Sequence, residues 1–390
     1  MKWLGLEHDV FVRQSDRVAR HREALEELIR TGAAYVSKEE AKDGSGVIKE
    51  IVRFKNPNEV VTFHDEIRGD VSMDTSDLGD FVIAKNMEEP LFHLAVVVDD
   101  FDAGITHVIR GEDHTSNTPR QILIQRALGA PTPIYAHLPL VLGLDKQKLS
   151  KRKGALAVSD YRDLGYLSDA LFNAATLVGW NPGTDQEIFS KDELMQIFDL
   201  SKVQKAGAVW NPEKLDWFNR EYIKNLSKES QLEYIENFIP EEVQSYPLYE
   251  GGLLERILPV LIERISKFSD IRVMHEAGEL SYFFQEPTYD YSLLIWKKMT
   301  GEEHEKKSKT GEILSHVSGL LASVSDYPTV DEVKDAVWSY AEELGRGDVL
   351  WPTRVALSGQ EKSPDPFTLI SIIGRNESIS RIEHAVAMLS

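Results

Sequence analysis

The sequence contains no cysteine, which excludes a disulfide framework and any metal site built on thiolates. It also lacks the long apolar run that a membrane-spanning helix or a signal peptide requires, so we expect a cytoplasmic protein with no membrane partner. Its eleven histidines are scattered without the spacing of a metal site, which favours ordinary surface or core histidines. The sequence therefore excludes a disulfide-rich domain and gives no sign of a membrane-spanning helix.

Positive charge is scarce overall: 44 lysines and arginines stand against 64 acidic residues, giving a formal net charge of −20. Non-specific affinity for nucleic acid comes from neutralising phosphates with lysine and arginine, so this composition excludes a general DNA-coating protein. A nucleic-acid partner would need a local basic surface. One such place exists, because "DKQKLSKRKG" at 145–154 carries five basic side chains in ten residues.

A chain of 390 residues with 42% hydrophobic residues predicts a large core and two or three domains. Most of the segment 161–225 is predicted to be helical, with a capping box from Ser190 to Glu193. Long amphipathic stretches from 226 to 390 predict a helical bundle, and Ser378 is the predicted cap of its last helix.

The N-terminal part shows a different pattern. A helix between Ser15 and Gly32 is followed by short β-prone runs over 33–90. "LFHLAVVVDD" (91–100) and "ITHVIRGEDH" (105–114) then predict two buried parallel strands. "TPRQILIQRALG" predicts a helix capped by Thr118, and "PIYAHLPLVLGL" a third strand. This order predicts an α/β sheet with its ligand loops at the carboxyl ends of the strands.

The basic run follows the third of these strands. An isolated basic run is usually a solvated hairpin tip. Here it would lie at the edge of an α/β sheet where phosphates bind, and a triphosphate needs several cations as its charge concentrates during loss of pyrophosphate. The context therefore favours a phosphate-binding loop.

Several motifs carry a family resemblance. "KLSKR" at 148–152 resembles the KMSKS-type loop of class I aminoacyl-tRNA synthetases, and "VVVDD", "VIRGEDH", "GWNPGTDQEIF" and "EKLDWFNREYI" follow in the order expected for bacterial glutamyl-tRNA synthetases. "LWPTRVALSG" and "SPDPFTLISIIGRNESISRIEHAV" resemble the end of their anticodon-binding region. Nearly the whole chain is covered by this similarity.

The resemblance implies a fold and a domain order. We expect an α/β nucleotide-binding, Rossmann-like catalytic domain with a small α+β insertion, followed by an all-α anticodon-binding domain. The implied boundaries are 1–160 for the catalytic domain, with an acceptor-end insertion at 33–90, then 161–225 for a helical stem-contact region and 226–390 for the anticodon-binding domain.

The resemblance also implies a reaction. Glutamate and ATP would give glutamyl-adenylate and pyrophosphate, and the acyl group would pass to the 3′ end of the tRNA for glutamate. The partners would be this tRNA, glutamate and ATP with Mg²⁺, and the chain would act as a monomer. We assign no residue to a resident metal and expect no zinc.

Residue roles follow by matching motifs. Lys151 would act on the ATP phosphates, with Lys148 assisting, and Arg110 would clamp a carboxylate of glutamate, a task suited to a planar guanidinium. The remaining matches are Ser150, Asp113 and the backbone of Val141 at ATP, and Phe92 and Val96 at glutamate. Phe92 stands where the family usually has tyrosine, and Val96 where some members have asparagine; a role for the neighbouring His114 stays open.

One departure is large. The second class I signature, His-x-Gly-His, is not found among the histidines, and "MKWLGL" resembles a position after the first βα unit. We therefore expect weak activation of glutamate by the chain as given.

One alternative is a truncated synthetase-like protein that binds tRNA without charging it. An enzyme that glutamylates queuosine would lack residues 226–390, and a glutaminyl-tRNA synthetase would end in β-barrels. The pattern does not specify whether charging extends to the tRNA for glutamine.

Overall fold

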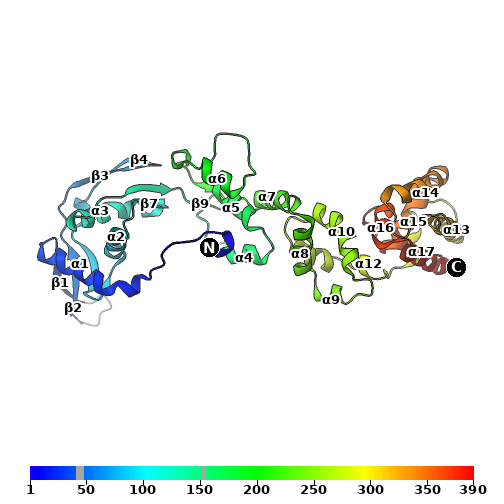
Figure 1. The fold of residues 1–390 in the computed structure, drawn as a ribbon, viewed down its shortest axis with the longest axis horizontal. Helices are drawn as coiled ribbons and strands as arrows, with labels where there is room; N and C mark the ends of the chain where they lie inside the picture. The colour runs from blue at the N-terminus through cyan, green and yellow to red at the C-terminus, as the bar shows by residue number, and fades with distance from the viewer. Residues whose placement is uncertain (41–47, 151–153) are drawn as a thin grey trace. The chain divides into compact units, whose positions relative to one another are not determined.

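A computed structural model describes residues 1–40, 48–150 and 154–390 (Figure 1). The chain divides into two compact units: an N-terminal unit of Met1–Ala157 with Ser168–Leu215, and a C-terminal unit of Val158–Leu167 with Asp216–Ser390. Among the described residues, no helix has both the length and the apolar character needed to cross a bilayer.

The N-terminal unit combines short strands with helices. Its strands are β1 (Ala34–Glu40), β2 (Ile48–Phe54), β3 (Val60–Asp65), β4 (Gly69–Asp74), β5 (Phe81–Asn86), β6 (Glu89–Pro90), β7 (His107–Gly111), β8 (Ile134–Leu138), β9 (Val141–Leu142) and β10 (Ala208–Val209). Its helices include α1 (Val18–Arg30), α2 (Phe92–Asp102), α3 (Thr118–Ala127), α5 (Ser168–Thr176) and α6 (Lys191–Ile197). Short 3-10 helices are η1 (Lys2–Leu4), η2 (Gln14–Arg17), η3 (Ser76–Leu78), η4 (Glu112–Asn117) and η6 (Leu200–Lys202).

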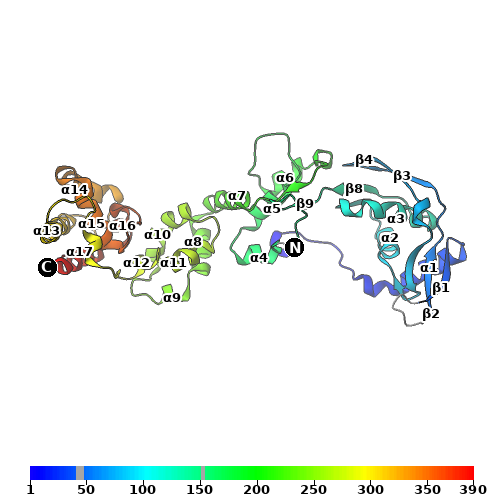
Figure 2. The same ribbon diagram turned by 180° about the vertical axis from the view of Figure 1, so that it is seen from behind.

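One sheet of this unit positions the candidate site. Its strand order is β4-β3-β8-β7, with β3, β8 and β7 parallel and β4 antiparallel. Helix α3 links β7 to β8, which is the βαβ connection that parallel neighbours require (Figures 1 and 2). The second sheet has the order β1-β2-β5-β6. The carboxyl ends of β7 and β8 therefore lie side by side, as the α/β prediction requires.

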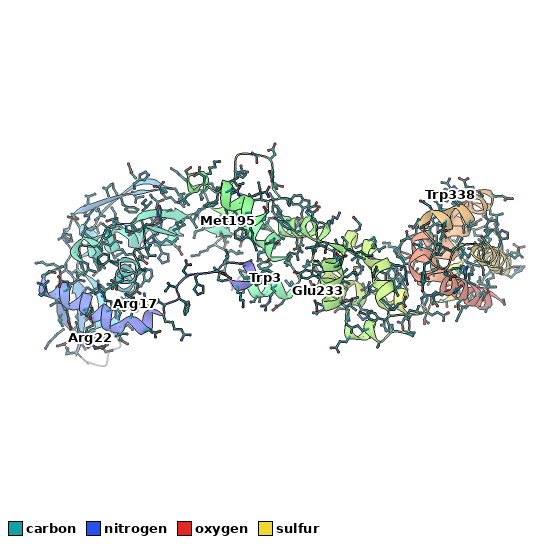
Figure 3. The ribbon with its side chains drawn as sticks, in the orientation of Figure 1. Trp3, Arg17, Arg22, Met195, Glu233 and Trp338 are labelled. Carbon is teal, nitrogen blue, oxygen red and sulfur yellow. The ribbon has the colours of Figure 1, made fainter. Side chains whose placement is uncertain are left out.

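The predicted strand at 91–100 is wrong, because this segment forms helix α2. A short continuous apolar run is consistent with either a buried strand or a buried helix, and periodicity alone does not separate the two. The acidic end of α2 is electrostatically unfavourable at a helix C-terminus. Two arginines offset it: Nε of Arg17, the last residue of η2, lies 2.7 Å from Asp99 Oδ1, and Nε of Arg20 in α1 lies 3.0 Å from Asp102 Oδ2. Arg17 is labelled in Figure 3.

Helix boundaries were predicted with mixed success. The capping box is confirmed, since Ser190 Oγ accepts from the Glu193 N–H and the Glu193 carboxylate accepts from the Ser190 N–H. Thr118 is the first residue of α3 rather than its cap, and its hydroxyl bonds other groups. Ser378 lies inside α17 (Arg375–Leu389), where its hydroxyl donates to the Gly374 carbonyl 2.6 Å away, so its predicted capping role is wrong.

The C-terminal unit is helical in its described residues, as predicted. The first part holds α4 (Val158–Asp163), α8 (Lys228–Phe238), α9 (Glu241–Gln244), α10 (Gly251–Arg264), α11 (Asp270–Glu276), α12 (Ser281–Phe284) and η7 (Tyr291–Leu294). Helix α7 (Pro212–Lys224) runs from one unit into the other. The last part is a bundle of α13 (Glu303–Leu321), α14 (Val330–Leu344), α15 (Arg346–Ser358), α16 (Pro366–Ile373) and α17.

Arg381 of α17 is the largest polar side chain in this bundle's core, with 1% of its surface exposed. Its Nη1 donates to the carbonyls of Tyr282 (2.6 Å) and Leu357 (2.7 Å), and its Nε donates to Glu377 (2.7 Å). Both carbonyls belong to final helix turns, of α12 and α15, where intrahelical partners are missing. Arg381 therefore satisfies two helix ends at once, although burial lowers its pKa.

Replacing Arg381 with methionine is expected to destabilise the C-terminal unit by about 3 kcal/mol, because it leaves buried carbonyls and a carboxylate without their donor. Urea denaturation followed by tryptophan fluorescence measures the change. The control is Lys228→Met, which removes an exposed pair with Glu255 in the same unit and should cost less than about 1 kcal/mol. Equal stability of the two variants would contradict the assigned role of Arg381.

Candidate active site

Arg110 and His137 form the centre of the candidate site. They are directly paired residues of the parallel strands β7 and β8, at the carboxyl end of each strand. Arg110 Nε donates to His137 Nε2 at 3.2 Å, and Arg110 Nη2 donates to Thr118 Oγ1 at 2.8 Å. The guanidinium carbon lies 5.6 Å from the centre of the Tyr135 ring. Burial lowers the pKa of Arg110 from its very high ordinary value, which leaves it a cation.

Asp65, at the end of β3, holds His137 from the other side. Both side chains are fully buried, and His137 Nδ1 lies 2.5 Å from Asp65 Oδ2. Burial acts to raise the pKa of Asp65, but the backbone N–H of Arg68 and the His137 imidazole outweigh it, so this pKa is lowered. Burial lowers the pKa of His137. A neutral imidazole with its proton on Nδ1 satisfies both contacts, since Nε2 then accepts from Arg110.

Phe92 and Val96 lie one helical turn apart on α2. Phe92 is 45% exposed, and its ring centre lies 5.5 Å from that of His114. Val96 packs partly buried against the core of the unit. His114 Nδ1 contacts the Asn117 amide at 3.1 Å. Phe92 therefore lies next to His114, which follows the carboxyl end of β7, whereas Val96 packs against the core.

The basic run begins in a hairpin that follows β9. Leu149 N–H donates to the Val141 carbonyl, and Gly143 N–H donates to the Gln147 carbonyl, each at 2.9 Å. Lys148 Nζ lies 2.7 Å from Asp113 Oδ2, and this hydrogen bond lowers the pKa of Asp113. Two residues assigned to ATP are therefore paired with each other. Ser150, two residues after Lys148, is partly buried, while Lys151 lies outside the described residues.

Val141 lies beside an apolar cavity of about 570 Å³. Its side chain is 41% exposed and lines this cavity together with residues of α5, α6 and β10, including Met195, which Figure 3 labels. The strand pair β9 and β10 fixes the loop, since the Leu142 carbonyl accepts from Trp210 N–H at 2.8 Å. The structure therefore places Val141 at an apolar surface, which suits contact with a planar base.

Sequence reasoning missed Asp65, His137 and the hydroxyl of Thr118. The available signal was a histidine within the apolar run "YAHLPL", because a polar residue in a buried strand needs a partner. A second omission is Glu112, which pairs with Arg68 and accepts from the Leu140 N–H at 2.9 Å. Within the described ranges, no group of three or more His, Asp or Glu side chains is arranged to hold a metal ion.

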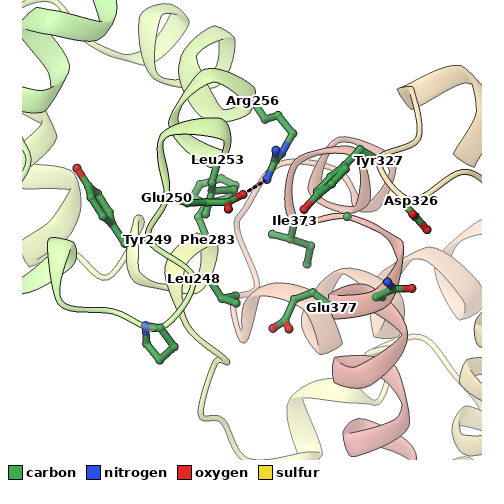
Figure 4. Close-up of a pocket in the computed structure, with 13 residues that line it drawn as sticks. Leu248, Tyr249, Glu250, Leu253, Arg256, Phe283, Asp326, Tyr327, Ile373 and Glu377 are labelled. Carbon is green, nitrogen blue, oxygen red and sulfur yellow. Dashed lines mark hydrogen bonds and ion pairs between the residues drawn. The ribbon is translucent and has the colours of Figure 1, made fainter.

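A separate pocket of about 500 Å³ lies in the C-terminal unit (Figure 4). The guanidinium carbon of Arg256 lies 4.1 Å from the Tyr327 ring centre, and Arg256 also pairs with Glu250 at 3.2 Å. Asp326 and Glu377 also line the pocket, so its carboxylates outnumber its cation. This charge balance disfavours a phosphate as its ligand.

Two protein families match consecutive parts of the chain. The family described as "tRNA synthetases class I (E and Q), catalytic domain" matches residues 36–217. The family described as "Anticodon binding domain" matches residues 212–386. The first match contains the candidate site around Arg110.

Individual proteins match over the whole chain. It is 35% identical to glutamate–tRNA ligase 2 of Coxiella burnetii strain Dugway and to glutamate–tRNA ligase 1 of strain RSA 331, over 100% of this chain and 86% of each relative. Among solved structures, a glutamate–tRNA ligase of Elizabethkingia meningosepticum in complex with its amino acid is 27% identical, with a TM-score of 0.82 over 100% of this chain and 88% of that one. The glutamate–tRNA synthetase of Elizabethkingia anophelis is 28% identical with the same TM-score, over 99% and 88%.

Proposed function

The chain belongs to the glutamate–tRNA ligase family of class I tRNA synthetases, and on this premise we propose that it joins glutamate to the 3′ end of the tRNA for glutamate in an ATP-dependent reaction. The observation that carries the proposal is the placement of Arg110. Its guanidinium lies at the carboxyl ends of parallel strands, where α/β proteins bind ligands, and is fixed by two side chains.

The first step would form glutamyl-adenylate. Arg110 would bind a glutamate carboxylate beside Phe92, and the α-carboxylate would attack the α-phosphorus of ATP with release of pyrophosphate. Catalysis of this kind depends on positioning and on stabilising developing charge, so no general acid or base is required. The family assignment and the contacts of Arg110 support this role.

The basic run at 145–154 would bind the phosphates of ATP. Lys148 and Lys151 would stabilise the departing pyrophosphate, with Ser150 nearby, while Asp113 and Val141 would face ATP. The hydrogen bond between Lys148 and Asp113 supports placing both residues at ATP. When ATP binds, the Lys148 ammonium can leave the Asp113 carboxylate and bind a phosphate oxygen instead. Mg²⁺ would enter with ATP as part of the substrate. We propose no zinc in the protein.

In the second step, a hydroxyl of the terminal adenosine of the tRNA would attack the acyl carbon of the adenylate, forming the ester and releasing AMP. We propose that 1–160 is the catalytic domain with an acceptor-end insertion at 33–90, that 161–225 contacts the tRNA stem and that 226–390 binds the anticodon. The match to an anticodon-binding family over 212–386 supports the last assignment.

We further propose that the protein is a cytoplasmic monomer. A non-catalytic tRNA-binding role is less favoured, because the relatives matched along the full chain are ligases.

An exchange assay tests this proposal. With tRNA for glutamate present, the chain should exchange labelled pyrophosphate into ATP, and the exchange should require glutamate. Exchange that proceeds equally with glutamine or without any amino acid would contradict the proposed substrate.

A further inference from the structure

We propose that Asp65, His137 and Thr118 form a positioning network that holds one edge of the Arg110 guanidinium and thereby presents its opposite edge to the substrate carboxylate. This inference rests on the proposed function for the identity of the carboxylate. Its structural part concerns only the N-terminal unit and the contacts within it.

The geometry assigns the two edges of the guanidinium. A guanidinium has a side-on edge, formed by Nε–H and one Nη2–H, and an end-on edge, formed by Nη1–H and the second Nη2–H. His137 accepts from Nε at 3.2 Å and Thr118 accepts from Nη2 at 2.8 Å, so the side-on edge of Arg110 is occupied. Within the described part of the chain no hydrogen bond uses Nη1, so the end-on edge is left to make the two parallel hydrogen bonds of a carboxylate pair.

The histidine performs this role only as an acceptor. Its Nε2 must carry no proton, because a proton there would face the Arg110 Nε–H. Asp65 sets that state by accepting from Nδ1 at 2.5 Å, and Asp65 is itself fixed by the backbone N–H groups of Ile67 (3.0 Å) and Arg68 (2.8 Å). The contacts therefore link the turn after β3 to Asp65, Asp65 to His137, and His137 to Arg110.

Thr118 adds a second constraint. Its Oγ1 accepts from Arg110, and its own proton has two acceptors within reach, His137 Nε2 at 3.2 Å and the His114 carbonyl at 3.3 Å. All three members of the network are fully buried, so the surrounding atoms restrict their rotation. An arginine held at two donors has few orientations left when the substrate arrives.

The test compares two changes at His137 in the full chain. His137→Leu removes the acceptor, whereas His137→Gln offers an amide oxygen where Nε2 was. The assay is glutamate-dependent exchange of pyrophosphate into ATP with tRNA present. His137→Leu should raise the glutamate KM about tenfold and change kcat less than about threefold. A tenfold rise is the loss expected for one charge-assisted hydrogen bond. His137→Gln should restore KM to within about threefold.

A matched control is present in the same unit. His21 is also fully buried and lies 2.9 Å from an aspartate, Asp99, near the opposite end of α2 from Phe92, and among the described residues it makes no hydrogen bond to Arg110. His21→Leu should therefore leave the glutamate KM unchanged. An equal KM rise in the His21 variant, or failure of His137→Gln to restore KM, would overturn the network.

A second measurement does not depend on activity. Nitrogen NMR of the labelled chain should show His137 neutral with its proton on Nδ1, and the Nε–H of Arg110, assigned by its absence in Arg110→Lys, should exchange faster with water in His137→Leu. A proton on His137 Nε2 would overturn the inference. If the NMR signals are as expected but the unmodified chain shows no glutamate-dependent exchange of pyrophosphate into ATP, the proposed function is wrong and the network is retained.

Discussion

Replacing Lys151 with alanine is expected to slow the formation of glutamyl-adenylate about 100-fold. The sequence places Lys151 in a run with the signature of a phosphate-binding loop, and the loss of one contact made in the transition state costs roughly two orders of magnitude in rate. Binding of tRNA should change little, because it depends on many contacts. Single-turnover adenylate formation, followed by rapid quench, measures the effect.

The matched control for this change lies in the same loop. Lys146 occupies a turn with φ of 58° just before the signature, and Lys146→Asn removes its charge while keeping a residue that tolerates that backbone conformation. This variant should slow activation less than about threefold. If both variants slowed it equally, the loop would act through total charge and the specific assignment of Lys151 would be wrong.

Replacing Arg110 with lysine is expected to raise the glutamate KM about 100-fold while leaving the KM for ATP within about threefold. Lysine keeps the positive charge but loses the planar fork, and each hydrogen bond from a charged donor contributes roughly 1.5–3 kcal/mol. It also loses the contacts with His137 and Thr118 that fix the side chain. Exchange assays at varied glutamate and varied ATP separate the two constants.

A surface arginine provides the control. Arg126 on α3 is exposed and pairs with Glu59 at 2.6 Å, so Arg126→Lys retains an ion pair and should leave both constants unchanged. A glutamate KM of Arg110→Lys close to that of the parent would remove Arg110 from the substrate site.

The fold was largely predictable where a pattern had one interpretation. Alternating or bounded β-prone runs gave β2, β3, β7 and β8, and helical periodicity gave the C-terminal bundle. Helix α2 was not predictable in this way, because its apolar run fits a buried strand equally well. Its conformation depends on tertiary contacts: Leu94, Val97 and Val98 are buried in the core of the unit. Arg17 of η2 and Arg20 of α1 also bind the aspartates at its C-terminal end.

The candidate site was predictable only in part. Motifs identified Arg110, Asp113 and Lys148, and the structure adds that the last two are paired. No pattern along the chain connects Asp65 with His137, since 72 residues separate them and their proximity depends on β3 pairing with β8. The environment of Arg110 is thus a property of the sheet, which local sequence reasoning does not reach.

Glutamate–tRNA ligase activity is tested by measuring the transfer of labelled glutamate to tRNA by this chain. The experiment uses single-turnover conditions with protein in excess, so that slow chemistry is still detected. We expect glutamyl-tRNA that forms on the tRNA for glutamate, requires ATP and falls at least tenfold in Arg110→Lys. Binding of that tRNA without any glutamyl transfer, the behaviour of a non-catalytic tRNA-binding protein, would contradict it.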